Sequence, residues 1–445
     1  MIKGYLRHFI CFSILVISAI STASGQKDTH VVEQGETLYR IARTNNLTVE
    51  QLLAANPNIT PETLKAGDVL KIPSKTSYNN TVSQKTTKSN PATVATTPSI
   101  AVILPFSATG IEGARSLEFY RGFLMGAEKF SKANKPCRIF AYEEGNSETS
   151  LSQIIEDMRR NNVQAFIGPV YPNHLKQLAD FARSNKTRMV VPFYSRAEQV
   201  NTNPYVYLLN TPSKFEQIHM SDLFVCTFKK TTVALMRFTN GDEYDFVSFL
   251  KNRLLALGYP VTEFRAEAST TQMLAACKGD AGVVIVPDDS KASSQAAALK
   301  AVASIKAANP GQSVSLVGYP SWFEQEKLIP QMNACNTYLF TSNFYNKYDA
   351  ATSQFEADYA AWFHAKTQNI SPRMGLLGYD AAQHLLTGIN KWGNDFSTQS
   401  SGAKMLQSEL RFERTEDEGG LVNSSMFFIH YKPDQTIDKI SAPKK

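Results

Sequence analysis

The chain has 445 residues, of which 43% are hydrophobic, and its formal net charge is +6. This length suits two or three domains, and the apolar content is enough for a sizeable core, so wholesale disorder is excluded. The basic residues are scattered, without an arginine-rich stripe or interleaved aromatic residues, and we therefore expect no nucleic-acid partner.

Residues 1–25 are predicted to form a secretory signal peptide. Lys3 and Arg7 give a basic start, residues 9–20 form an apolar run, and small residues precede a cleavage site before Gln26. The apolar run is too short to span a bilayer comfortably, and no stop-transfer run follows, so cleavage is favoured over an uncut signal anchor. The mature chain would carry a net charge of +4 and no transmembrane helix.

Cys11 lies early in this apolar run and lacks the residues that precede a lipidated cysteine, so no lipoprotein is predicted. The mature chain keeps four widely spaced cysteines: Cys137, Cys226, Cys277 and Cys335. They form neither a CxxC pair nor a cluster with histidine, and no metal site is predicted. Export would permit disulfides, but four buried thiols are an equally open interpretation.

Residues 29–74 are predicted to form a small domain with the order strand, helix, helix, strand. The strands are expected at 30–32 and 69–72, and the helices begin at Thr37 and Thr48, which can act as N-caps. Leu38, Ile41 and Ala42 form the apolar stripe of the first helix, and Val49, Leu52 and Leu53 that of the second.

This unit resembles the LysM family at residues 30–32, 35–38, 41–42, 47–49, 52, 56 and 64–73. The resemblance implies binding of glycans that contain N-acetylglucosamine, and therefore of peptidoglycan. In the family the glycan lies between the turn before the first helix and the loop after the second, which here comprise Gly35, Glu36, Thr37, Leu38, Asn56, Pro57, Asn58, Ile59 and Thr60. Backbone groups would hold the acetamido groups, while Leu38 and Ile59 would cover apolar sugar faces. For Gly35 and Asn56 a purely structural role is equally open.

Residues 75–99 are rich in Thr and Ser, contain lysines and lack Asp and Glu. This composition predicts a flexible tether with a reach of roughly 30 Å.

From residue 100 onward, the sequence alternates between apolar strands and amphipathic helices. Strands are predicted at 100–104, 138–142, 165–170, 189–194, 233–238, 261–264, 282–287 and 314–318, with a final hairpin at 426–440. The alternation predicts an α/β fold with two parallel sheets and helices on both faces, arranged as two lobes with a cleft between them.

This region, residues 100–445, resembles the type I periplasmic-binding-protein fold, the leucine-binding family in particular. The resemblance rests on residues 100–106, 119–128, 165–169, 190–195, 314–318 and 378–382. In that family the chain crosses between lobes three times, so lobe 1 would take about 100–212 and 350–392. Lobe 2 would take about 213–340 and 393–445.

The resemblance implies a ligand at the carboxyl ends of the strands. The candidate contacts are Phe106, Ser107, Tyr171, Tyr194, Ser195, Tyr319, Trp322, Phe344 and Tyr345. Their aromatic character would suit a ring or a sugar, although each aromatic residue is at least as well explained by packing between the lobes.

The sequence departs from the family's amino-acid binders, which place a Ser after the Gly-Pro turn and a Ser/Thr pair after the fourth strand. Here Val170-Tyr171-Pro172 follows the turn, and only Ser195 of the pair is retained. Glu143-Glu144 stands where an acid after the second strand is common. Amino-acid binding is therefore in doubt.

No catalytic motif is present: the sequence lacks HExxH, GxSxG, a Walker A loop and GxGxxG. Asp288-Asp289 is interpreted as a strand-end turn, and Glu416-Asp417-Glu418 as a solvated approach to a hairpin. His219, His364 and His384 are assigned ordinary structural places on helices. We predict no enzyme activity, no cofactor and no bound metal.

The leading hypothesis is a periplasmic protein that is anchored to peptidoglycan by LysM and binds a small molecule in its two-lobed domain. The second is a scaffold or regulator of cell-wall synthesis enzymes, because the domain organisation also resembles lipoprotein activators of peptidoglycan synthases. A wall hydrolase is a third hypothesis, for which catalytic residues are missing.

Overall fold

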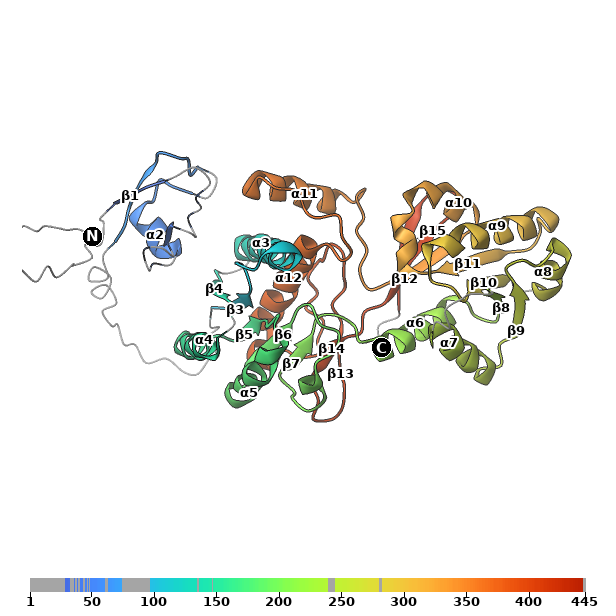
Figure 1. Ribbon diagram of the computed structural model, residues 1–445, viewed down its shortest axis with the longest axis horizontal. Coiled ribbons are helices and arrows are strands. Elements are labelled where there is room, and N and C mark those ends of the chain that lie inside the picture. The colour runs from blue at the N-terminus through green and yellow to red at the C-terminus, as the bar shows by residue number, and fades with distance from the viewer. Residues whose placement is uncertain are drawn as a thin grey trace, which may run out of the picture. The chain divides into compact units, whose positions relative to one another are not determined.

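The computed structural model describes residues 29–32, 36, 38, 41–42, 45, 47, 49–60, 63–73, 97–133, 136–145, 147–238, 245–279 and 282–442 (Figure 1). The chain divides into two compact units, Met1–Ala92 and Thr93–Lys445. The predicted signal peptide and most of the predicted linker lie outside the described residues.

The first unit contains a two-stranded antiparallel sheet, in which β1 (Thr29–Val31) pairs with β2 (Val69–Lys71). Helix α2 (Val49–Ala55) follows the second predicted start at Thr48. Both predicted strands and the second helix are confirmed. The core comprises Val32, Leu38, Ile41, Ala42, Leu52, Leu70 and Ile72. These are the apolar positions of the sequence pattern, so burial of this stripe stabilises the small unit.

The second unit contains two seven-stranded sheets, and lobe 1 is built on the first. Its strand order is β13-β14-β7-β6-β5-β3-β4. The strands are β3 (Ser99–Leu104), β4 (Arg138–Glu143), β5 (Ala165–Ile167), β6 (Arg188–Val191), β7 (Val206–Leu208), β13 (Phe412–Arg414) and β14 (Leu421–Asn423). All neighbours are parallel except β13 and β14.

Alternate residues of β3 enter different cores, because successive side chains of a strand point to opposite faces. Ile100 and Val102 pack in one core, while Ala101 and Ile103 pack in the other. The unbroken apolar run of β3 therefore marks a strand that is covered on both faces.

Lobe 1 contains helices α3 (Gly110–Ala133), α4 (Glu148–Arg160), α5 (Leu175–Asn185), α11 (Ala350–Phe363) and α12 (Met374–Trp392), and the short 3₁₀ helices η2 (Pro172–His174), η3 (Glu198–Asn201) and η6 (Gly393–Asp395).

Helices α3 and α12 lie side by side (Figure 1), although more than two hundred residues separate them in the sequence. Glycine permits this close approach. A Cβ atom at Gly122 would lie 1.7 Å from the carbonyl oxygen of Gly375, and one at Gly378 would lie 1.9 Å from that of Phe119. Any larger residue at these positions would force the two helices apart.

Lobe 2 is built on the second sheet, with the order β16-β15-β12-β11-β10-β8-β9. Its strands are β8 (Thr232–Arg237), β9 (Val261–Arg265), β10 (Val283–Pro287), β11 (Val314–Gly318), β12 (Thr337–Thr341), β15 (Phe427–Tyr431) and β16 (Ile437–Ser441). Its helices are α6 (Ser213–Thr227), α7 (Asp245–Ala256), α8 (Thr270–Ala276), α9 (Ala292–Ala308) and α10 (Ile329–Ala334), with 3₁₀ helices η4 (Pro320–Glu324) and η5 (Glu326–Leu328). The predicted C-terminal hairpin is confirmed as β15 and β16, which pair antiparallel.

The chain passes between the two sheets three times, after β7, β12 and β14, as the family resemblance implies. The predicted assignment of residues 393–445 to lobe 2 is wrong in its first part. Strand β14 pairs with β7 of lobe 1, with Leu421 opposite Tyr207, and Phe396 and Phe412 pack in the lobe 1 core. Only β15 and β16 of this segment join lobe 2. The three-residue strands are too short to show a period in the sequence.

Cys137, Cys226, Cys277 and Cys335 are all free thiols. Burial raises the pKa of both Cys277 and Cys335 to about 11, which is typical of unreactive structural thiols. Within the described ranges, no group of three or more His, Cys, Asp or Glu side chains could hold a metal ion. No helix in the part of the chain that the structure describes is long and apolar enough to cross a membrane.

Candidate functional site

Asn56, a predicted glycan contact, is buried and ties the end of α2 to β2. Its side-chain amide donates to the carbonyls of Leu52 and Lys71 at 2.7 and 2.9 Å, and its Oδ1 accepts from the Lys71 N–H at 2.8 Å. Three hydrogen bonds satisfy most of the capacity of this side chain. The geometry therefore favours the structural role for Asn56.

Leu38 is only 5% exposed and belongs to the core of the small unit, so the expectation that it covers a sugar face is corrected. Ile59 is half-buried against the same core. The exposed members of the predicted glycan site are Pro57, Asn58 and Thr60. Glu36 is another predicted contact, and its carboxylate lies 2.6 Å from His30 Nε2. Gly35 and Thr37 lie outside the described residues.

In lobe 1, the predicted contacts lie where the parallel strands end, and we call this surface the carboxyl edge of lobe 1. It comprises Phe106, Ser107, Glu143, Glu144, Val170, Tyr171, Tyr194 and Ser195. The exposed Ser107 donates from its backbone N–H to Glu143 at 3.1 Å and from its hydroxyl at 2.7 Å. The Phe106 ring packs on Tyr120, with 5.0 Å between ring centroids. The hydrogen bonds of Ser107 to Glu143 thus link the ends of β3 and β4 to each other.

Glu144 is the central buried group of this edge, with 2% of its surface exposed. Its carboxylate accepts from the backbone N–H of Val170 at 2.7 Å and from that of Tyr171 at 2.9 Å, and it lies 3.0 Å from His174 Nδ1. Burial raises the pKa of Glu144, while the two backbone donors and His174 oppose the shift. Sequence analysis noted Glu144 as an acid after a strand but missed this contact.

Tyr171 and Tyr194 remain partly exposed beside Glu144. The Tyr194 hydroxyl donates to the carbonyl of Val170, and the Tyr171 ring meets His174 edge-on at 6.0 Å. Burial raises the pKa of both phenols, and the negative charges of Glu112 and Glu144 raise it further. Both hydroxyls therefore stay protonated at neutral pH. Ser195 is half-buried beyond Tyr194.

In lobe 2, Tyr319 and Trp322 are buried in the core, with 1% and 0% of their surfaces exposed. The Tyr319 hydroxyl donates to the carbonyl of Pro287, and a Cβ atom at Gly318 would lie 2.3 Å from the Trp322 ring. The prediction that these two residues contact a ligand is corrected, because η4 folds back and turns Trp322 into the lobe.

Phe344 and Tyr345 lie in the segment that crosses back to lobe 1. The Phe344 N–H donates to the carbonyl of Gln407 at 2.8 Å, and its ring packs on Phe323 of η4 at 5.4 Å. Arg373 stacks over the Tyr345 ring at 3.7 Å. These contacts give both residues a structural role in holding the crossing segment.

Asp288 and Asp289 directly follow β10 and form the predicted strand-end turn. Asp288 accepts from the Phe238 N–H at 2.8 Å and lies 3.4 Å from Arg237, while Asp289 accepts from the Lys291 N–H at 2.9 Å. Both carboxylates thus accept hydrogen bonds from neighbouring backbone N–H groups, and Asp288 also pairs with Arg237.

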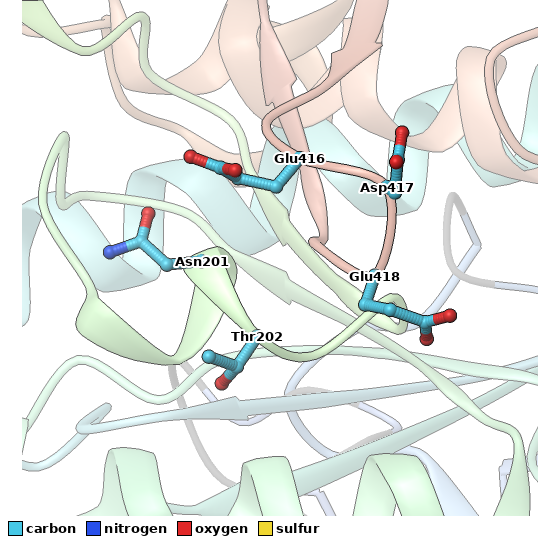
Figure 2. A pocket seen from close by; sticks show the side chains of 5 residues that line it. All are labelled: Asn201, Thr202, Glu416, Asp417 and Glu418. Atoms are coloured by element: carbon cyan, nitrogen blue, oxygen red, sulfur yellow. The ribbon is translucent and has the colours of Figure 1, made fainter.

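A shallow hollow on lobe 1 is lined by Asn201, Thr202, Glu416, Asp417 and Glu418. The three acidic residues form the turn between β13 and β14, which confirms a hairpin at this position. Figure 2 shows their carboxylates pointing away from one another. Such a splayed arrangement fits a solvated turn better than a cation cage.

Two family models match the chain. A LysM domain matches residues 30–73, and a periplasmic binding protein domain matches residues 97–420. This chain belongs to the periplasmic binding protein family. Its second unit has the type I fold of that family, and its first unit is a LysM domain. A comparison with curated proteins gave no match.

Solved structures share the fold at low sequence identity. A putative branched-chain amino acid ABC transporter from Rhodospirillum rubrum has a TM-score of 0.52 at 12% identity, covering 78% of this chain and 100% of that one. Full-length LpoA from Haemophilus influenzae has a TM-score of 0.46 at 11% identity, covering 78% and 59%. A branched chain amino acid ABC transporter periplasmic ligand-binding protein from Burkholderia xenovorans has a TM-score of 0.43 at 16% identity, covering 77% and 94%. At these identities the likeness concerns the fold alone.

Proposed function

We propose that this is an exported, periplasmic, peptidoglycan-binding protein without catalytic activity. The LysM domain at residues 30–73 is the observation that carries the proposal. The basic start and apolar run of residues 1–25 support export. The exposed residues Pro57, Asn58 and Thr60, together with residues 35–37, are the proposed glycan contacts.

For the second unit we propose binding of a small ligand at the carboxyl edge of lobe 1. Membership of the periplasmic binding protein family supports this role, as does the position of Ser107, Tyr171, Tyr194 and Ser195. Ser107 is exposed and the other three are partly buried, and all four follow parallel strands at their carboxyl ends, where α/β proteins bind their ligands.

A scaffold or regulator of cell-wall enzymes is the second candidate. The burial of Tyr319 and Trp322 favours it, because lobe 2 then offers a ligand fewer side chains than the sequence predicts. Under this alternative, the domain acts through protein contact and its lobes need no small molecule between them.

Sedimentation with purified sacculi tests the anchoring role. The mature chain should pellet with sacculi, and a chain that lacks residues 29–74 should stay in the supernatant. Soluble N-acetylglucosamine oligomers should compete with sacculi for the full chain. Equal sedimentation of the two chains would contradict a LysM anchor.

Calorimetry of the mature chain with amino acids, sugars and muropeptides separates the two roles of the second unit. A saturable ligand supports small-molecule binding. Absence of any ligand, together with co-purification of a wall enzyme, supports the scaffold. Release of dye from labelled peptidoglycan would contradict the proposed lack of catalysis.

A further inference from the structure

The backbone amides that follow β5 are already occupied by a carboxylate of the protein itself. The two oxygens of Glu144 accept separately, Oε2 from the Val170 N–H and Oε1 from the Tyr171 N–H, at 2.7 and 2.9 Å. The next residue, Pro172, has no N–H to offer. Three consecutive residues of this loop therefore keep no amide donor for a ligand.

This position matters because ligands of α/β sheets bind beyond the carboxyl ends of the strands. Backbone N–H groups at such a place commonly hold an anion. Here the Glu144 carboxylate takes that place. The loop also carries no serine hydroxyl that could donate a further hydrogen bond to a ligand carboxylate.

Two further residues of this edge also direct donors to partners within the protein. Ser107 directs both its N–H and its hydroxyl to Glu143, and Tyr194 directs its hydroxyl to the Val170 carbonyl. This edge thus presents the Glu143 carboxylate and two partly exposed phenol rings, with the Glu144 carboxylate buried beside them, which disfavours an incoming carboxylate and suits a neutral or positively charged group.

We propose that Glu144 determines the ligand class of the second unit. Its carboxylate takes the place of a ligand carboxylate, so the domain rejects free α-amino acids and accepts an uncharged or cationic ligand, such as an amide or an amine. This inference rests on the proposed small-ligand function and narrows it.

The test compares acetate with acetamide, its neutral analogue, on the full mature chain. Glu144→Ala removes the internal carboxylate and leaves the two amides free. Acetate should then raise the melting temperature of the variant saturably, and acetamide should not. Because a hydrogen bond to a charged group contributes about 1.5–3 kcal/mol, acetate should bind the variant at least about tenfold more tightly than wild type.

Glu118→Ala is the matched control. Glu118 is also buried and accepts two backbone N–H groups, those of Gln368 and Gly375 at 2.8 and 3.1 Å, but it belongs to α3 and binds the start of α12. An equal acetate response in this control, or no acetate response in a folded Glu144→Ala protein, would overturn the proposal.

If Glu144→Ala does not fold, wild-type calorimetry with L-leucine and L-leucinamide decides. Saturable binding of L-leucine overturns the proposal, and its absence supports it. Should wild type bind none of the compounds tested while Glu144→Ala gains acetate, the assignment of Glu144 stands and the small-ligand function fails. The two inferences can therefore fail separately.

Discussion

The same dipeptide follows a parallel strand in each lobe, with opposite outcomes. Tyr171-Pro172 follows β5 and Tyr319-Pro320 follows β11, and in each case a 3₁₀ helix begins at the proline. The residue three positions after the tyrosine returns its N–H to the tyrosine carbonyl, at 3.1 Å for His174 and 3.0 Å for Trp322. The ring pairs are also alike, edge-on at 6.0 and 6.1 Å.

What differs is the partner of the third residue. His174 meets the carboxylate of Glu144 in a polar edge, where Tyr171 stays partly exposed. Trp322 instead fills an apolar core and draws Tyr319 below the surface. The local motif therefore gives the same turn in both lobes, but the tyrosine is partly exposed only where the third residue meets Glu144 and is buried where that residue packs in an apolar core.

The largest expected effect comes from Trp322→Ala, which removes a fully buried indole from lobe 2. We expect a loss of about 3–5 kcal/mol in unfolding free energy, measured by urea denaturation. Phe106→Ala at the half-buried edge of lobe 1 should cost clearly less. Comparable losses would mean that the two edges do not differ in packing.

Acid should weaken lobe 1 through His384, which packs between Phe396 and Phe412. Burial lowers its pKa from 6.5 to about 3. Below pH 6.5 the imidazole binds a proton in the unfolded chain but not in the folded chain. The unfolding free energy is therefore highest above pH 6.5 and falls by about 1.4 kcal/mol for each pH unit below it.

His384→Leu should flatten the stability profile between about pH 4 and 6.5 by that slope, as judged from urea denaturation at several pH values. His430 of β15 is the control in lobe 2. Burial lowers its pKa as well, but it is less buried, so His430→Gln should change the profile less. An unchanged profile in His384→Leu would contradict the prediction.

The smallest and most discriminating comparison is between Tyr319→Phe and Tyr194→Phe. Each removes a hydroxyl that donates to a backbone carbonyl, that of Pro287 at the end of β10 and that of Val170 in the loop after β5. Each should cost about 1 kcal/mol in unfolding free energy. Only Tyr194→Phe should also weaken the binding of a ligand identified by calorimetry. If Tyr319→Phe weakened ligand binding as well, Tyr319 would belong to the ligand site after all.

The sequence predicts elements well where apolar runs are long, as in β3, but it misses the short strands β7 and β14. It predicts the strand-end positions of the candidate site from the family resemblance, together with the rule that ligands of α/β sheets bind at the carboxyl ends of the strands. It cannot distinguish Tyr171 from Tyr319, because both precede proline after an apolar strand. The contact of Glu144 with Val170, 26 residues away, has no local pattern that would predict it.

The pairing of β14 with β7 has a consequence for the order in which the protein can fold. Lobe 1 begins near residue 99, yet its sheet is complete only when residues 421–423 have been synthesised, and α12 must already be present to cover α3. Lobe 2 likewise waits for β15 and β16. Neither lobe can therefore finish folding as an independent early unit, and the nascent chain keeps unpaired strand edges in both sheets until its last segments emerge.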